Sequence, residues 1–101
     1  MRFFARRVLR EFWENPGHED AEIPLKTWIA VVEAAHWNTP HDVKAQYSDA
    51  SIISSERVVF NIGGNKYRII AAIDYAAGVL LVKFIGTHTE YDKMDARTYG
   101  I

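Results

Sequence analysis

The fold is decided by residues 57–75, which read RVVFNIGGNKYRIIAAIDY. Apolar side chains alternate with others along 57–62 and again along 66–75, which is the period-two spacing of strands with one buried face. Gly63, Gly64 and Asn65 lie between the two runs and tolerate positive φ angles, so they predict a tight turn. The stretch therefore predicts a β-hairpin.

A third strand is expected directly after this hairpin. Residues 76–78 (Ala-Ala-Gly) predict a second turn, and residues 79–86 form an apolar run that only one lysine interrupts. Strands joined in this way form an antiparallel meander. The sheet face away from the apolar side chains is expected to be open and basic, exposing Arg57, Asn61, Lys66, Arg68 and Lys83.

Before residue 50 the apolar spacing is helical. A first stripe runs from Phe4 to Trp13 and ends at Asn15-Pro16-Gly17, a typical helix terminator. A second stripe runs from Leu25 to His36 with the spacing of a core-facing helix, and Pro24 suits its first turn. Three residues on or beside these stripes are expected in the core: Trp13, Trp28 and Trp37.

A third, shorter helix is predicted after the second. Thr39-Pro40-His41-Asp42 resembles a capping box, and the helix is expected to run through Tyr47. Residues 1–4 fit either the first helix or a short strand, and periodicity favours neither. Helices followed by an antiparallel sheet are typical of an α+β fold, so we expect N-terminal helices packed on one face of a twisted, mainly antiparallel sheet.

Composition narrows the class of protein. The chain has 101 residues, 49% of them hydrophobic and 25% charged, which suits a single globular domain covering residues 1–101. No apolar run approaches the length of a membrane span and no signal peptide is recognisable, so a cytoplasmic location with no membrane is expected. Cysteine is absent, which excludes disulfides, thiolate nucleophiles and thiolate metal sites.

The chain has a formal net charge of −1, but its charged residues are distributed unevenly along the sequence. Residues 1–10 carry four arginines and no acid, residues 11–56 carry nine acids against two lysines, and residues 57–101 carry six cations against four acids. An acidic middle segment is commonly just a solvated face. Basic residues near both ends can nevertheless converge on a polyanion or on an acidic partner.

Two short motifs carry candidate chemistry. Around the first turn, backbone N–H groups, Lys66 and Arg68 can bind a phosphate, although a plain hairpin turn with surface cations has the same pattern. Past the last strand, a helical turn would place His88, Tyr91 and Asp92 on one side. A histidine and a phenol there can transfer protons, or they can simply cap the turn and pack on the sheet edge.

The other histidines point to structure. His36 ends the second apolar stripe, which favours a partly buried structural histidine. Without cysteine or an HExxH pattern, no metal and no cofactor is expected.

Residues 57–68, followed by GTHTEYDK at 86–93, resemble the HigB family of toxin–antitoxin toxins. Segments 9–13, 25–28 and 42–44 fit the same pattern, so the resemblance spans nearly the whole chain. It implies a RelE-like fold and an mRNA interferase that cuts mRNA in the ribosomal A site. It also implies a cognate HigA antitoxin with a helix-turn-helix domain, with operator DNA bound only through the toxin–antitoxin complex.

Under this resemblance, RNA is cleaved without a metal by general acid and base groups. Arg68 is the candidate for stabilising transition-state charge, His88 for general acid or base, and Tyr91 for orienting the nucleotide or donating a proton. Lys66 and Lys83 would hold the RNA backbone or add charge, and cationic surroundings could lower the pKa of one of these lysines enough for it to act as base. The acid and base assignments are interchangeable. The expected RNA-binding residues are Arg57, Asn65, Lys83 and Lys93.

The alternative is a non-catalytic module that binds RNA or an acidic protein segment on the basic face. The same cations serve both functions, whereas binding alone requires neither His88 nor Tyr91. A further possibility is that antitoxin and RNA compete for one surface, with acidic antitoxin residues neutralising the cations.

Overall fold

The computed structural model describes residues 1–100. Its elements in chain order are β1 (Arg2–Phe4), α1 (Arg6–Glu14), the 3-10 turn η1 (Glu19–Ala21), α2 (Glu22–Ala34), α3 (Pro40–Gln46), β2 (Ser51–Ile52), β3 (Arg57–Ile62), β4 (Tyr67–Asp74), β5 (Val79–Thr87) and α4 (His88–Tyr91). The α+β class predicted from the sequence is confirmed. Within the described residues, no helix is both long and apolar enough to cross a bilayer.

Five strands form one mixed sheet in the order β1-β5-β4-β3-β2. β3, β4 and β5 form the predicted antiparallel meander, and Gly63 and Gly64 have φ angles of 62° and 70° in its first turn. β1 is an edge strand parallel to β5, with Phe3 opposite Leu80. The predicted hairpin and third strand are therefore confirmed. The parallel pairing of β1 with β5 joins residues far apart in the chain, and no local sequence pattern predicts it.

The open question at residues 1–4 is resolved in favour of a strand. β1 ends at Phe4 and α1 begins at Arg6, so Phe4 lies outside the helical stripe and its side chain is 43% exposed. The rest of the two stripes is largely confirmed, because α1 and α2 turn most of the expected apolar residues inward, but Val8 of the first stripe is 45% exposed. The buried residues are Leu9, Phe12 and Trp13 on α1 and Leu25, Trp28, Ile29 and Val32 on α2.

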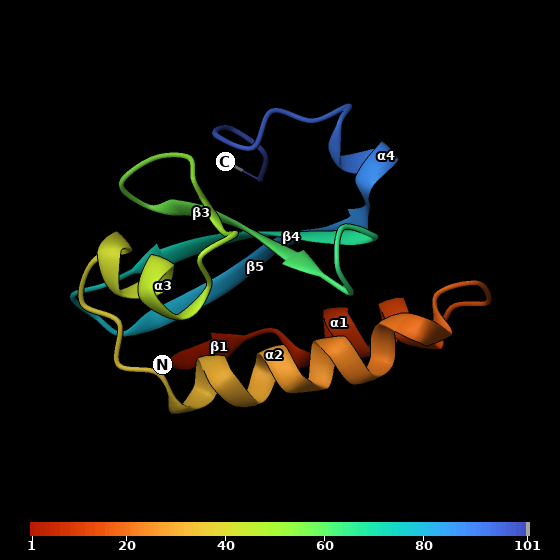
Figure 1. The fold of residues 1–101 in the computed structure, drawn as a ribbon, viewed down its shortest axis with the longest axis horizontal. Helices are drawn as coiled ribbons and strands as arrows, with labels where there is room; N and C mark the ends of the chain where they lie inside the picture. The colour runs from red at the N-terminus through yellow and green to blue at the C-terminus, as the bar shows by residue number, and fades with distance from the viewer. Residues whose placement is uncertain (101) are drawn as a thin grey trace.

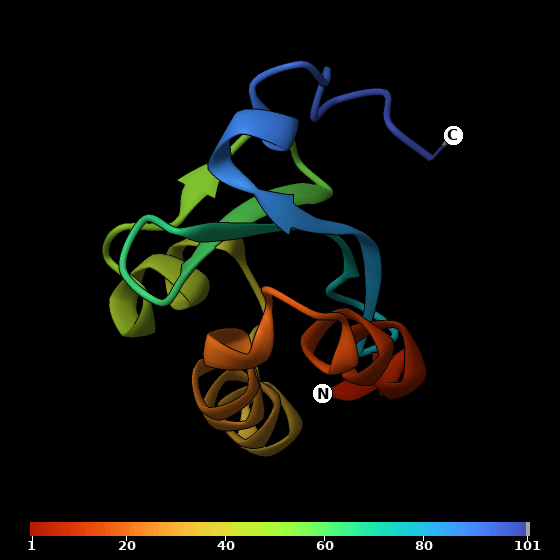
Figure 2. The same ribbon diagram turned by 90° about the vertical axis from the view of Figure 1, so that its right-hand side faces the viewer.

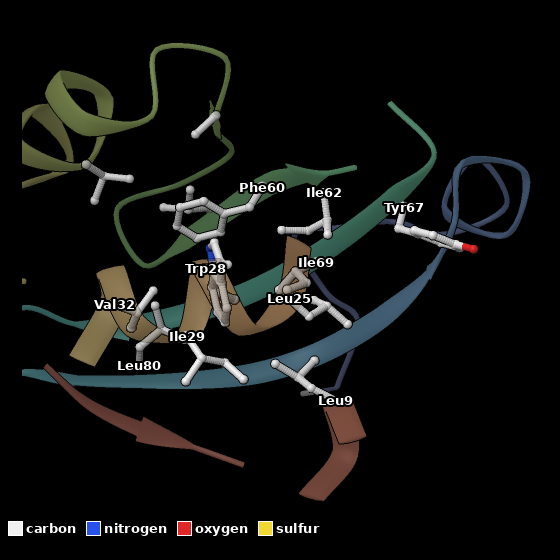
Figure 3. Packing of buried hydrophobic residues seen from close by; sticks show 14 of the residues in the cluster. Leu9, Leu25, Trp28, Ile29, Val32, Phe60, Ile62, Tyr67, Ile69 and Leu80 are labelled. Carbon is white, nitrogen blue, oxygen red and sulfur yellow. The ribbon is translucent and has the colours of Figure 1, made fainter. Parts of the chain in front are cut away.

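The main core lies between α1, α2 and α3 and one face of the sheet (Figure 1). Trp28 points from α2 toward the sheet, where its ring packs edge-on against Phe60 on β3 with centroids 5.3 Å apart (Figure 3). The Trp37 ring stacks on the Phe60 ring with centroids 6.0 Å apart. Trp13, Trp28 and Trp37 are all buried, as predicted.

Local capping explains where α3 begins. Thr39 Oγ1 accepts a hydrogen bond from the Asp42 backbone N–H (3.3 Å), and the Asp42 carboxylate accepts one from the Thr39 N–H (3.2 Å). The predicted capping box is confirmed. The prediction for His36 is wrong: α2 ends at Ala34, the backbone becomes extended at Ala35, and His36 is exposed.

The second face of the sheet is covered, which corrects the expectation of an open basic face. α4 and the segment 92–100 lie across it, on the side opposite α1 and α2 (Figure 2). Val59, Ile70 and Ala96 form a small buried cluster there, and Arg57 is only 6% exposed. A period-two pattern identifies two faces of a strand, but it does not reveal which later segment returns to cover one of them.

Candidate functional site

Strand pairing brings the two predicted motifs together. In the register of β4 and β5, Arg68 lies opposite Gly86 and Tyr67 opposite Thr87. The backbone N–H of His88 donates to the carbonyl of Lys66 (3.2 Å), which joins α4 to the end of the β3–β4 turn. In Figure 1, α4 stands beside that turn. The two motifs, which lie far apart in the chain, thus meet at one end of the sheet, where β4 begins and β5 ends.

A capping box fixes the start of α4. Thr87 Oγ1 accepts a hydrogen bond from the Glu90 N–H (3.2 Å), and Glu90 Oε1 accepts one from the Thr87 N–H (2.9 Å). The latter bond is the main reason that the pKa of Glu90 is lowered. The helical turn that the sequence allowed at 88–92 is therefore present, and the two hydrogen bonds of its capping box hold His88 and Tyr91 at the end of β5.

Gly86 makes room for this arrangement. A Cβ at Gly86 would lie 2.4 Å from the ring of Phe84 and 3.1 Å from Glu90 Oε1. The absence of a side chain lets the Phe84 ring lie over Gly86, and both Phe84 and Tyr91 pack against the small buried cluster. Gly86 is therefore needed for sterics rather than for a positive φ angle.

Arg68 and Tyr91 form the centre of the candidate site. The Arg68 guanidinium lies over the Tyr91 ring with its carbon 4.9 Å from the centroid, which is cation–π geometry. Among the described residues no carboxylate forms an ion pair with Arg68, and its buried Nε has no hydrogen-bond partner. A planar cation with unused donors is suited to bind phosphate oxygens.

His88 is oriented by an acid on the same turn. Its Nδ1 lies 3.1 Å from Asp92 Oδ2, so Nε2 is the nitrogen available to exchange a proton with a ligand. The sequence placed Asp92 on the same side as His88 and assigned it no role. Over residues 1–100, no three histidine, aspartate or glutamate side chains gather in a group that could hold a metal ion.

Lys66 is paired with an acid from the helical layer. Asp20 on η1 accepts hydrogen bonds from both Lys66 Nζ and the Tyr67 hydroxyl. The Lys66 bond is the largest cause of the lowered pKa of Asp20, and the same bond raises the pKa of Lys66. The hypothesis of a lysine base with a lowered pKa is therefore wrong for Lys66. Asp20 itself was missed, because 46 residues separate it from Lys66.

The predicted RNA-binding residues divide into two groups. Asn65 in the β3–β4 turn and Lys93 after α4 are exposed beside the candidate site. Arg57 and Lys83 instead contact the 92–100 segment, where Lys83 Nζ donates to the Gly100 carbonyl (3.4 Å) and Arg57 donates to two other carbonyls. The structure thus gathers Lys66, Arg68, His88 and Tyr91 at one end and leaves Arg57 and Lys83 beneath a covering segment.

Comparison with known proteins shows which family the chain is similar to. Residues 21–94 match the HigB toxin model, described as the RelE-like toxic component of a toxin–antitoxin system. The mRNA interferase toxin HigB of Escherichia coli K12 is 27% identical over 99% of this chain and 98% of its own length, and mRNA interferase HigB of Shigella flexneri aligns equally well. The mRNA interferase HigB of Escherichia coli O6:H1 is 27% identical over 71% of this chain and 72% of its own length.

Proposed function

The chain belongs to the HigB toxin family, the RelE-like toxic component of toxin–antitoxin systems, and on that premise we propose that it is an mRNA interferase acting on translated mRNA. In this proposal residues 1–101 act as one toxin domain in the cytoplasm, where the ribosome presents the substrate. The full-length relatives named as mRNA interferases support the reaction class. The dependence on the ribosome is what the family resemblance implies.

The observation that carries the proposal is the Arg68 guanidinium stacked on Tyr91 at 4.9 Å, one helical turn from His88. The unused donors of Arg68 would bind the non-bridging oxygens of the scissile phosphate and stabilise the charge that grows on them. Lys66, held protonated by Asp20, adds positive charge at the edge of the same site.

Cleavage without a metal ion needs two proton transfers. One group removes the proton of the ribose 2′-hydroxyl, whose oxygen attacks the phosphorus, and another donates a proton to the departing 5′-oxygen. The products are a 2′,3′-cyclic phosphate and a free 5′-hydroxyl. His88 Nε2, with Nδ1 held by Asp92, is suited to either transfer. The Tyr91 hydroxyl is the second candidate, and the two assignments are interchangeable.

Family membership implies a cognate antitoxin. We infer that this partner is a HigA-type protein with a helix-turn-helix domain and that operator DNA is contacted through the complex. Lys66, Arg68 and Lys93 offer a basic edge to which an acidic antitoxin segment can bind in competition with RNA. Charge reversal at Arg68 would then weaken antitoxin binding, and an unchanged affinity would contradict this competition.

The test compares cleavage of a translated reporter mRNA with cleavage of the same mRNA lacking its start codon, mapped by primer extension after induction. We expect the wild-type protein to cut only the translated message. Arg68→Ala is expected to lower the cleavage rate about 10²–10³-fold, as for loss of a group that stabilises transition-state charge. His88→Ala is expected to lower it about 10²–10⁴-fold. Arg10→Ala, which removes an exposed arginine from α1, is the matched control and should retain the wild-type rate.

Each other outcome has a defined meaning. Cleavage of both messages would show that the protein is a nuclease whose activity does not depend on the ribosome. Cleavage of neither, with folded protein present, would favour the alternative of a non-catalytic RNA- or protein-binding module. Full activity in folded Arg68→Ala or His88→Ala protein would remove that residue from the catalytic set.

A further inference from the structure

Arg57 is a buried cation that the nuclease proposal does not use. It lies on β3, its side chain is 6% exposed, and its Nη1 donates to the carbonyls of Ala96 (3.4 Å) and Tyr99 (2.5 Å). A guanidinium removed from water is costly unless its donors find acceptors. Here the acceptors are backbone carbonyls of the 92–100 segment, so the cation holds this segment against the sheet.

The segment that Arg57 holds is part of the cluster beneath the candidate site. Ala96, whose carbonyl is one of the two acceptors, packs with Val59 on β3 and Ile70 on β4. Tyr91 and Met94 are partly buried against the same cluster. The position of the 92–100 segment therefore bears directly on the packing of the Tyr91 ring.

An aromatic contact also joins the segment to β5. The Tyr99 ring packs edge-on against Phe84 with centroids 5.6 Å apart, and Phe84 belongs to the cluster that includes Tyr91. Arg57 thus hydrogen-bonds to two carbonyls of the segment, at Ala96 and Tyr99, and both of these residues also contact the sheet. Loss of the guanidinium would remove both hydrogen bonds at once.

The ring of Tyr91 in turn supports Arg68. Arg68 and Ile70 are two residues apart on β4, so their side chains lie on the same face of the strand. We propose that Arg57 is a positioning residue for RNA cleavage: it fixes the 92–100 segment on the sheet and thereby holds the Tyr91 ring under the Arg68 guanidinium. This inference rests on the proposed nuclease function.

The competing explanation is that Arg57 binds an RNA phosphate directly, as expected from the sequence. Direct binding requires RNA to displace the Ala96 and Tyr99 carbonyls from a side chain that is almost fully buried. The two explanations differ in a measurable way. A phosphate ligand contributes to the salt dependence of RNA binding, whereas a positioning residue changes the rate of the chemical step.

The experiment measures kcat and KM for cleavage of mRNA on programmed ribosomes, together with the salt dependence of binding to a short RNA. We expect Arg57→Met to lower kcat at least about 10-fold, a loss of roughly 1.4 kcal/mol of transition-state stabilisation, while KM changes less than about 2-fold. The slope of log K against log salt should stay unchanged, because loss of one phosphate contact would reduce it by about 0.7. Arg97→Met, an exposed arginine in the same segment, is the control and should keep the wild-type kcat.

A double-mutant cycle tests whether Arg57 acts through Tyr91. In a Tyr91→Ala background, Arg57→Met should lower kcat much less than it does in the wild-type protein, because the ring that it positions is gone. Additive losses would show that Arg57 does not act through this ring and would overturn the inference. If Arg57→Met does not fold, Arg57→Lys replaces it in both experiments, since it keeps the charge but loses the planar fork.

Failure of the inference is distinguishable from failure of the nuclease proposal. Wild-type cleavage with an unchanged kcat in folded Arg57→Met, or a raised KM with a smaller salt slope, would overturn the positioning role and leave the function intact. Absence of cleavage by the wild-type protein would overturn the function, and the positioning role with it.

Discussion

The two faces of the sheet are built by different means. The face under α1, α2 and α3 buries an extensive apolar core that includes Trp28, Trp37 and Phe60. The opposite face buries a small cluster of Val59, Ile70 and Ala96, and around it lie cations that contact a ring or backbone carbonyls. One face is closed by helices, the other by a single turn and the segment 92–100 (Figure 2).

We expect the helix-covered face to supply most of the folding free energy and the opposite face to carry the residues that act in cleavage. Apolar burial is the main source of folding free energy, so the helix-covered face is expected to supply most of it. The opposite face has few apolar contacts and unused polar groups, such as Arg68 Nε. Substitutions on this face are therefore expected to lower the cleavage rate more strongly than they lower the free energy of unfolding. The predictions below test this separation.

The largest effect is expected from Trp28→Ala in the main core. Removing a fully buried indole should lower the free energy of unfolding by about 3–5 kcal/mol, from lost burial and the cavity left behind. Urea unfolding followed by circular dichroism measures this change. Tyr91→Ala on the opposite face is the comparison and should cost only about 1 kcal/mol, since that ring is half-buried. Equal losses would contradict the separation of the two faces.

Gly86→Ala is expected to have the next largest effect. The new Cβ would meet the Phe84 ring at 2.4 Å, and relief of such overpacking costs about 1–3 kcal/mol. Displacement of Phe84 should also disturb Tyr91 and lower the cleavage rate. Adding Phe84→Leu removes the ring that clashes, so the double variant should regain stability relative to Gly86→Ala, which a thermal unfolding series can measure. No recovery would show that the ring is not the cause.

Each face of the sheet has one threonine that caps a helix. Thr39 caps α3 on the helix-covered face and Thr87 caps α4 on the opposite face, each in a complete capping box. Replacement of either by alanine should cost about 1 kcal/mol of stability, measured by chemical denaturation. Only Thr87→Ala should also lower mRNA cleavage, because α4 carries His88 and Tyr91. Equal activity in the two variants would show that the α4 cap does not matter for the reaction.

The smallest effect is expected at Asp20, which links η1 to the end of the hairpin. Its hydrogen bonds from Lys66 and Tyr67 lower the pKa of Asp20 from its ordinary value of 3.8. A lowered pKa stabilises the fold above the unfolded-state value, and this stabilisation is lost as the pH falls through the folded-state pKa. The difference in Tm between wild type and Asp20→Asn should therefore be present at about pH 7 and shrink below about pH 4.

Lys66→Met provides the control for that experiment. It removes the other member of the ion pair, so Asp20→Asn should change the Tm much less in this background. A Tm difference that stays constant with pH, or an undiminished effect in the Lys66→Met protein, would contradict the assigned role of the pair.

Much of the fold follows from local patterns. The alternation along 57–62 and 66–75 predicted two strands, and residues 63–65 predicted the turn between them. The Thr39–Asp42 box was likewise predicted, because capping depends on residues three positions apart. The sequence also allowed a helical turn at 88–92, but the Thr87–Glu90 capping box that begins it was not predicted. The burial of Arg57 and the exposure of His36 were not predicted, and the strand at 2–4 was only one of two alternatives that the sequence left open.

Hydrogen bonds and side-chain spacing within a few residues account for α1, α2, α3, the β3–β4–β5 meander and the two motifs, so these follow from local sequence, whereas the short strands β1 and β2 do not. Which charges are paired and which are unused depends on tertiary packing. Asp20 meets Lys66 across 46 residues, and Arg57 meets Ala96 across 39. Such contacts depend on how distant segments pack against each other, and no local periodicity encodes that packing. The candidate site is the end of the sheet where this packing left Arg68, Tyr91 and His88 together.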